Sequence, residues 1–271
     1  MSPTSVLAEG SSKPLVGVVH LAPLPGSPLN TLTFDEIRDR ALSDAASYER
    51  GGASALIVEN YGDVPYGKSR VEPHVVAAMA MIVDRLKSNT SLPIGVNVLR
   101  NDAHSALGIA AITGATFIRV NIHTGAMVTD QGIIEGQADQ TLRYRQLLST
   151  QTEIWADVHV KHGAPLGDLS IEQAAEDAVF RGLADAVIVS GSGTGQPTNA
   201  TDVQRVRTRL PDTRIFVGSG VSPETLPSLL PFASGFIVGT WVKEEGEVRR
   251  PVDARRVARL IEMIRTLGES Q

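Results

Sequence analysis

The chain has 271 residues, of which 42% are hydrophobic, with a net charge of −5 at pH 7 and no cysteine. This length suits one α/β barrel, and the interleaving of basic with acidic residues leaves no basic surface of the kind that a nucleic-acid partner requires. The absence of cysteine excludes disulfide bonds, a thiolate nucleophile and a Cys-based zinc site.

The first 13 residues are mostly polar and lack the basic start and apolar stretch of a signal peptide. No apolar run further along the chain approaches the length needed to span a membrane. We therefore expect a cytoplasmic protein with no membrane span, in which residues 1–13 form a flexible tail and residues 14–271 form one barrel domain.

From Pro14 onward, short β-branched runs alternate eight times with longer amphipathic stretches. The series is not divided by a Pro/Gly/Ser-rich linker or by a shift in composition. The eight predicted strands are LVGVVH (15–20), ALIVEN (55–60), IGVNVL (94–99), FIRVNI (117–122), IWADVHV (154–160), AVIVS (186–190), RIFVG (214–218) and GFIVG (235–239).

Several of the intervening stretches carry helix start signals. Thr33 with Glu36 and Ser170 with Gln173 match capping boxes, Ser222-Pro223 places proline in a first helical turn, and a last helix is predicted over 253–267. Eight βα units predict a single (β/α)₈ TIM barrel with its active site at the C-terminal face of the strands. An open doubly wound sheet with an appendage is the alternative.

Alternation within the fourth and fifth strands places polar residues on one face. Because successive side chains of a strand point to opposite sides, the polar set must share a face opposite the apolar set. A barrel strand packs its apolar face against the helices, so the polar set is predicted to point into the barrel mouth. The polar set comprises Arg119, Asn121 and His123 on the fourth strand and Asp157, His159 and Lys161 on the fifth.

Three earlier strands add polar residues at the same level, namely His20, Glu59, Asn60 and Asn97. Burying an unpaired charge costs several kcal/mol, so such residues pair with one another, stay solvated or act on a ligand. The convergence of five strands favours a ligand site. The alternative for Arg119 and Asp157 is a purely structural ion pair between neighbouring strands.

Small residues follow the last three strands and predict a phosphate site. Glycines let backbone N–H groups approach a ligand, hydroxyls add donors, and barrel enzymes often hold phosphate on the last two loops. The alternative is that these glycines serve only tight turns. The candidate phosphate contacts are Ser190, Gly191, Gly218, Ser219, Gly220, Gly239 and Thr240, and the candidate substrate contacts are Asn97, Asn60 and Thr194.

The segments VGVVHLAPLPGSP, GGASALIVENYGDVPY, GVNVLRNDAHSALGIA, FIRVNIHTGAMVTDQGIIEG, WADVHVKHGAPLG, VIVSGSGTGQPT and VGSGVSPET together resemble the BtpA family, also called the BtpA/SgcQ family. The resemblance runs in strand order from about Val16 to the last helix. It implies a ribulose-phosphate-binding type of barrel. It also implies that the branches of the family differ in function, since one is tied to photosystem I biogenesis and others are found among sugar- or nucleoside-handling proteins. The resemblance assigns no catalytic residue.

Two classes of function follow. The first is an enzyme that acts on a phosphorylated small molecule by lyase, isomerase or glycosyl-cleaving chemistry, and the second is a non-catalytic biogenesis or ligand-sensing protein that works through its surface. In the enzyme, Asp157 or Glu59 is the general base, His159 or His20 the acid, Arg119 and Asn121 stabilise negative charge, and Lys161 is a candidate for a Schiff base.

We expect no cofactor, although a divalent metal is an alternative because Glu59, Asp157, His159, His162 and His20 are suitable ligand types. Arg119 and Lys161 argue against a cation beside them. The long segments after the second and fourth strands, 61–73 and 123–137, are candidates for lids or subunit contacts, and we expect a homo-oligomer.

Overall fold

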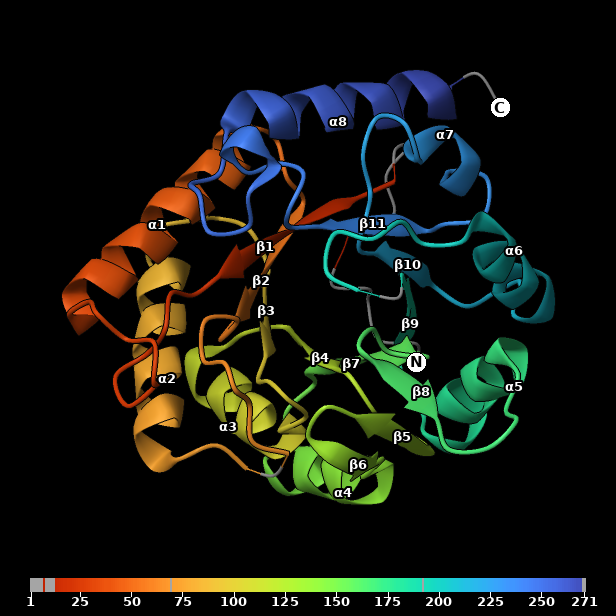
Figure 1. The fold of residues 1–271 in the computed structure, drawn as a ribbon, viewed down its shortest axis with the longest axis horizontal. Helices are drawn as coiled ribbons and strands as arrows, with labels where there is room; N and C mark the ends of the chain where they lie inside the picture. The colour runs from red at the N-terminus through yellow and green to blue at the C-terminus, as the bar shows by residue number, and fades with distance from the viewer. Residues whose placement is uncertain (1–6, 8–12, 69, 192, 270–271) are drawn as a thin grey trace.

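The computed structural model describes Leu7 and residues 13–68, 70–191 and 193–269. Most of the predicted tail, residues 1–13, therefore lies outside the described residues. Eight parallel strands close into a barrel in the order β1-β11-β10-β9-β7-β4-β3-β2 (Figure 1), which confirms the (β/α)₈ prediction. The strands are β1 Leu15–His20, β2 Ala55–Glu59, β3 Ile94–Asn97, β4 Phe117–Val120, β7 Glu153–Val158, β9 Ala186–Ser190, β10 Ile215–Gly218 and β11 Gly235–Val238.

Helices form the outer ring of the barrel (Figure 1). Both predicted capping boxes are present, with Thr33 and Ser170 each accepting a bond from the backbone of the third helical residue. Pro223 lies in the turn that leads into the seventh helix, which begins at Leu226, and the Leu226 N–H donates to the Ser222 carbonyl over 2.9 Å. The helices are α1 Phe34–Arg50, α2 Pro73–Lys87, α3 Ala103–Thr113, α4 Ala138–Leu147, α5 Ile171–Glu176 with a π-helix Asp177–Arg181, α6 Ala200–Arg209, α7 Leu226–Leu229 and α8 Ala254–Gly268.

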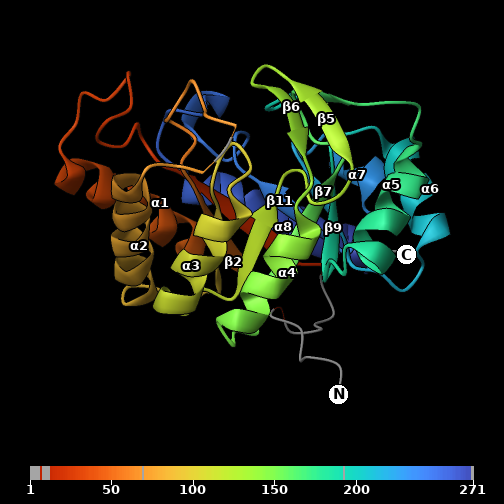
Figure 2. The same ribbon diagram turned by 90° about the horizontal axis from the view of Figure 1, so that it is seen from below.

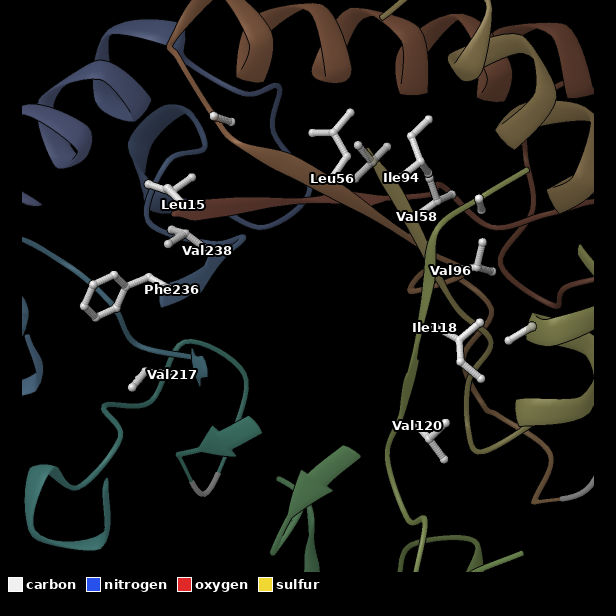
Figure 3. Packing of buried hydrophobic residues seen from close by; sticks show 14 of the residues in the cluster. Leu15, Leu56, Val58, Ile94, Val96, Ile118, Val120, Val217, Phe236 and Val238 are labelled. Carbon is white, nitrogen blue, oxygen red and sulfur yellow. The ribbon is translucent and has the colours of Figure 1, made fainter. Parts of the chain in front are cut away.

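The hydrophobic core has two parts. Outward-facing residues of the strands, such as Leu56, Val96 and Ile118, pack against the helices (Figure 3). Inside the barrel, Trp155 stacks between two phenylalanine rings, with its ring centroid 3.9 Å from that of Phe117 and 4.2 Å from that of Phe216. This stack of Phe117, Trp155 and Phe216, the aromatic floor, fills the lower part of the barrel, so the interior is packed and forms no pore.

Strand register brings the polar strand ends to one level. His20 lies opposite Glu59, and Glu59 lies opposite Asn97 across the next pair of strands. The predicted alternation holds along β7 as far as Val158, with Ile154 and Val158 in the helix-facing core and Trp155 inside the barrel. The C-terminal ends of the strands therefore carry the polar residues above the aromatic floor.

A separate three-stranded antiparallel sheet forms from the loops that follow β4 and β7. Its strands are β5 Ala126–Thr129, β6 Gly132–Glu135 and β8 Gly163–Pro165. Met127 and Ile134 pack beneath this sheet on Ile122 and Val160, which attaches it to the barrel. Figure 2 shows β5 and β6 projecting above the barrel. No helix in the described ranges is long and apolar enough to cross a lipid bilayer.

Candidate functional site

A buried ion pair joins β4 and β7 above the aromatic floor. Arg119 Nε and Nη2 donate to the two carboxylate oxygens of Asp157, each over 2.9 Å, and both side chains are almost fully buried. Arg119 Nη1 also lies 3.8 Å from Glu59 Oε2. A guanidinium fork bound through two parallel bonds has a fixed orientation, so this pair holds Arg119 in place beneath the mouth.

Amide and hydroxyl groups complete the bonding of Asp157. Asn121 Nδ2 donates to its Oδ2 over 3.0 Å, and Ser190 Oγ donates to its Oδ1 over 3.0 Å. Asn97 in turn donates to Asn121 Oδ1 over 3.0 Å and to the Arg119 carbonyl over 2.9 Å. Because four donors already occupy its oxygens, Asp157 is placed to orient Arg119 rather than to accept a proton from a ligand.

Glu59, His20 and Lys161 lie where two cavities of the mouth meet, since all three line both. Burial lowers the pKa of His20 well below 6.5, and the nearby Lys243, Lys161 and Arg119 add to the effect. The imidazole is therefore neutral at pH 7, and its Nδ1 has no hydrogen-bond partner among the described residues. Burial also lowers the pKa of Lys161, an effect that Glu59 opposes.

His159 does not join this cluster, although alternation along the strand predicts it there. The strand ends at Val158, and His159 has a φ of 52°, which turns its side chain away from the mouth. Its charged neighbours are Asp202, Arg205 and Glu172 on α5 and α6. Period-two alternation fails at this residue because it requires extended backbone, whereas Lys161, two residues further on, returns to the cavities.

The two asparagines expected to contact substrate serve the framework instead. Asn60 Oδ1 accepts from the Leu99 backbone over 2.7 Å, and its Nδ2 donates to Asp63 over 3.1 Å. Asn97 is turned toward Asn121, as described above, and neither Asn60 nor Asn97 lines either cavity. Thr194 does line both cavities, and its backbone N–H donates to His162 Nε2 over 3.2 Å.

The loops after β10 and β11 enclose a small cavity of about 260 Å³. Ser219 and Gly220 have φ values of 71° and 62°, in the left-handed region. A Cβ on Gly239 would lie 2.4 Å from the His20 ring, so only glycine leaves space for that ring. The small cavity is lined by Val18, His20, Glu59, Arg119, Lys161, Thr194, Gly195, Pro197, Ser219, Gly220, Val221, Ser222, Thr225, Ile237, Val238, Gly239, Thr240, Trp241 and Gly246.

Four of the seven predicted phosphate contacts therefore line the small cavity, and three do not. Ser190 is turned to Asp157, and the Gly191 Cα faces the carbonyls of Gln196 and Pro197, which cover it. Gly218 faces the barrel interior, where a Cβ would lie 3.1 Å from Ile188. The residues at 195–197 fold back over the end of β9, and this return of the chain hides Gly191.

A second, large cavity of about 1140 Å³ opens on the side of β1, β2 and β3. It shares His20, Glu59, Lys161 and Thr194 with the small cavity. Its charged lining residues are mostly basic, although the whole chain carries a net charge of −5, and this excess favours an anionic ligand. These are Arg40, Arg100, Lys161, Lys243, Arg249 and Arg250, against Asp44, Glu59 and Asp130.

Two of these basic residues are functional candidates that the strand pattern missed. Lys243 is 1% exposed and pairs with Asp44, whose Oδ1 also accepts from the Val252 backbone over 2.8 Å. Arg100 donates to the Lys161 carbonyl over 2.6 Å. Arg100 follows the end of β3 by three residues and Lys243 follows the end of β11 by five, and this position just past a barrel strand is the signal that points to them.

Within the described part of the chain, no three His, Asp or Glu side chains are grouped so that they could hold a metal ion. The predicted metal ligands are separated because His159 faces α5 and α6, and Asp157 is bound to Arg119. His162 bonds to Thr194 at the edge of the mouth. The geometry thus offers donors to an anion more readily than ligands to a cation.

A family model described as the BtpA family matches residues 11–266. The chain belongs to the BtpA family. A relative in Synechocystis, named photosystem I biogenesis protein BtpA, is 46% identical over 92% of this chain and 87% of its own length. An uncharacterized protein of Thermococcus kodakarensis is 45% identical over 95% of this chain and 97% of its own. A Caenorhabditis elegans protein, named as uncharacterized and mitochondrial, is 35% identical over 95% of each chain.

Solved structures resemble this BtpA-family chain in fold. Phosphoribosyl anthranilate isomerase from Thermus thermophilus matches with a TM-score of 0.56 at 13% identity, over 94% of this chain and 99% of its own. CdNal from Clostridium difficile, in complex with mannosamine, matches with a TM-score of 0.58 at 11% identity, over 96% of this chain and 77% of its own. At such identities the likeness concerns the barrel alone.

Proposed function

We propose that this BtpA-family protein is an enzyme that acts on a phosphorylated small molecule at the C-terminal face of its barrel. The observation that carries the proposal is the small cavity, whose lining combines small residues of the last two loops with ionisable groups. The first set is Ser219, Gly220, Gly239 and Thr240, and the second is Glu59, Arg119, His20 and Lys161. A phosphate bound by the first set would hold the remainder of the molecule within the same cavity as the second.

Glu59 is the carboxylate best placed to act as general base. It is 2% exposed, lines both cavities and lies 3.8 Å from Arg119, whereas Asp157 is fully bound. The neutral His20 has one ring nitrogen that can donate a proton and one that can accept it. Arg119 supplies a fixed positive charge for developing negative charge on the substrate. These groups suit lyase, isomerase or glycosyl-cleaving chemistry.

The fold comparison supports this proposal in one respect. The barrel resembles an isomerase whose name specifies a phosphoribosyl compound, and TIM barrels often hold phosphate on their last two loops. In this chain the corresponding loops follow β10 and β11, and they line the small cavity. The proposal extends that use of the fold to this protein.

Binding of phosphorylated compounds tests the proposal. A ligand that binds only the folded state at 100 times its Kd stabilises it by about 2.7 kcal/mol, which corresponds to a rise in Tm of about 5–10 °C. We expect such a rise with one or more members of a panel of sugar phosphates and nucleotides. Gly239→Ala, which would displace His20, should abolish it.

Thr208→Val is a matched control, because Thr208 lies on α6 and its hydroxyl bonds only to the backbone of its own helix. This variant should keep the full rise in Tm. An unchanged Tm for the wild-type protein with every phosphorylated compound at millimolar concentration would overturn the proposal.

A second candidate function rests on the Synechocystis relative, whose name specifies photosystem I biogenesis. A biogenesis factor would act through its outer surface, and exposed apolar side chains are present on the helices, including Ile112 on α3 at 85% exposure and Leu147 on α4 at 76%. This function predicts that Glu59→Gln leaves the biological role intact. Complementation of a strain lacking the gene with that variant separates the two candidates.

A further inference from the structure

The mouth of the barrel contains two lysines whose surroundings differ. Lys243 is ion-paired with Asp44. Lys161 has no such partner: among the residues that the structure describes, no carboxylate lies within 4.0 Å of its amine, and the amine makes no hydrogen bond. An unpartnered amine in a largely enclosed site is costly to keep charged.

The position of Lys161 is fixed at the point where the small and large cavities meet. Its side chain lines both, together with Glu59 and His20. Arg100 holds the backbone of Lys161 by donating to its carbonyl over 2.6 Å, although Lys161 lies outside the regular strand. A ligand in the small cavity therefore lies beside the Lys161 side chain, and the bond from Arg100 limits the movement of the Lys161 backbone.

We propose that Lys161 forms an iminium with the carbonyl carbon of a phosphorylated aldehyde or ketone. This inference rests on the proposed function, because it requires the phosphate to be held by the loops after β10 and β11. It narrows the substrate class to compounds that carry both a phosphate and a carbonyl group. It also assigns a covalent step to a residue whose only other evident use would be electrostatic.

The step is balanced within the site. The Lys161 ammonium transfers one proton to Glu59 through a water molecule, since the two groups are more than 4.0 Å apart, and the free amine attacks the carbonyl carbon, so that a C–N bond forms and the C–O π bond breaks. The oxygen takes that proton back and a second one from the nitrogen, and it leaves as water. The iminium remains, and Glu59 is again a carboxylate. The net reaction converts the lysine ammonium and the carbonyl compound into an iminium and one water molecule.

The electrostatics of the site assist this reaction. Burial is the main cause that lowers the pKa of Lys161; Arg119 and Arg100 lower it further, Glu59 and Asp157 oppose them, and the net direction is downward. Each unit of lowering raises the fraction of neutral amine about tenfold at pH 7. Once formed, the iminium withdraws electrons from the neighbouring carbon, and Glu59 is available to remove a proton there.

Borohydride trapping tests the inference on the intact protein. Wild-type protein is incubated with glyceraldehyde 3-phosphate or dihydroxyacetone phosphate and reduced, and peptides are then measured by mass spectrometry. We expect the mass of the reduced adduct on the Lys161 peptide, with labelling about tenfold or more above that of the Lys243 peptide. Lys243 is an internal control because it faces the large cavity but is ion-paired.

Two comparison compounds and one variant define the outcomes. Dihydroxyacetone lacks the phosphate and should label Lys161 far less, and Lys161→Arg should lose the adduct while it keeps the wild-type Tm within a few degrees. Glycerol 3-phosphate lacks the carbonyl and reports binding alone. If glycerol 3-phosphate raises the Tm of the wild-type protein but Lys161 remains unlabelled, the iminium is overturned and the phosphate site stands.

Three further results would count against the inference. Labelling of Lys161 that is equal to that of Lys243 would show that its surroundings do not activate the amine. Equal labelling by dihydroxyacetone and its phosphate would overturn the assigned substrate class. If glycerol 3-phosphate, the phosphorylated carbonyl compounds and every other phosphorylated compound leave the Tm unchanged and Lys161 is unlabelled, both the proposed function and the inference fail.

Discussion

The replacement Asp157→Ala is the most direct test of the network in the barrel mouth. The Asp157 side chain is inaccessible to solvent, and Arg119 is 4% exposed. The substitution removes the acceptor of two bonds of 2.9 Å from Arg119 and strips single acceptors from Asn121 and Ser190. Arg119 then keeps only Glu59, at 3.8 Å, as a counter-charge.

Breaking a buried ion pair by removal of one partner costs about 3–5 kcal/mol, because the other charge stays buried and uncompensated. We expect a loss of this size in the free energy of unfolding of Asp157→Ala, measured by urea denaturation. The double variant Asp157→Ala/Arg119→Met should recover part of the loss, since no unpaired charge remains.

Asp139→Ala is the matched control, because its ion pair with Arg143 is 67–77% exposed and should contribute nothing measurable. A loss below about 1 kcal/mol for Asp157→Ala would refute the reasoning, since it would mean that water or another group compensates Arg119. A double variant less stable than Asp157→Ala would contradict the assignment of the loss to an uncompensated charge.

Two further predictions concern His20 and Gly220. The pKa of His20 is held well below 6.5, so below that pH the unfolded chain binds a proton that the folded chain does not. The free energy of unfolding should therefore fall as the pH drops from 7 towards 5. Denaturation at several pH values should show that His20→Gln reduces this dependence on pH by up to about 1.4 kcal/mol per pH unit. An unchanged dependence would contradict the lowered pKa of His20. Gly220→Ala should cost about 1–3 kcal/mol, because φ is 62° and the new Cβ would lie 2.4 Å from the Gln196 carbonyl. Gly114→Ala, with a φ of 71° and open space around it, is the control, and an equal loss in both would exclude the clash.

The sequence predicted the barrel well because its strands are marked by buried β-branched runs that differ from the helical stretches between them. All eight predicted strands are present, and both ends of each lie within two residues of the predicted bounds. The three-stranded sheet was missed because β8 is only three residues long and its partner β5 lies more than thirty residues away. A pairing of that kind depends on the folded barrel rather than on a local pattern.

The sequence predicted the part of the candidate site that lies within regular strands, and the prediction failed just beyond the strand ends. Arg119 and Asp157 lie within the alternating pattern, and they meet as expected. His159 lies one residue past its strand with a positive φ, which residue type alone does not reveal. Gly191 has the composition of a phosphate loop, but the return of the chain at Pro197 covers it. Contacts across loops decide such cases.

The aromatic floor has a consequence for how ligand binding can be observed. The chain has two tryptophans, of which Trp155 is fully buried in the stack beneath the mouth and Trp241 lies in the wall of the small cavity. Arg256 lies over the Trp241 ring, 4.3 Å from its centroid. A ligand in the small cavity lies against Trp241 and not against Trp155, so we expect the larger change in emission from Trp241. The protein therefore carries its own optical reporter and requires no added dye.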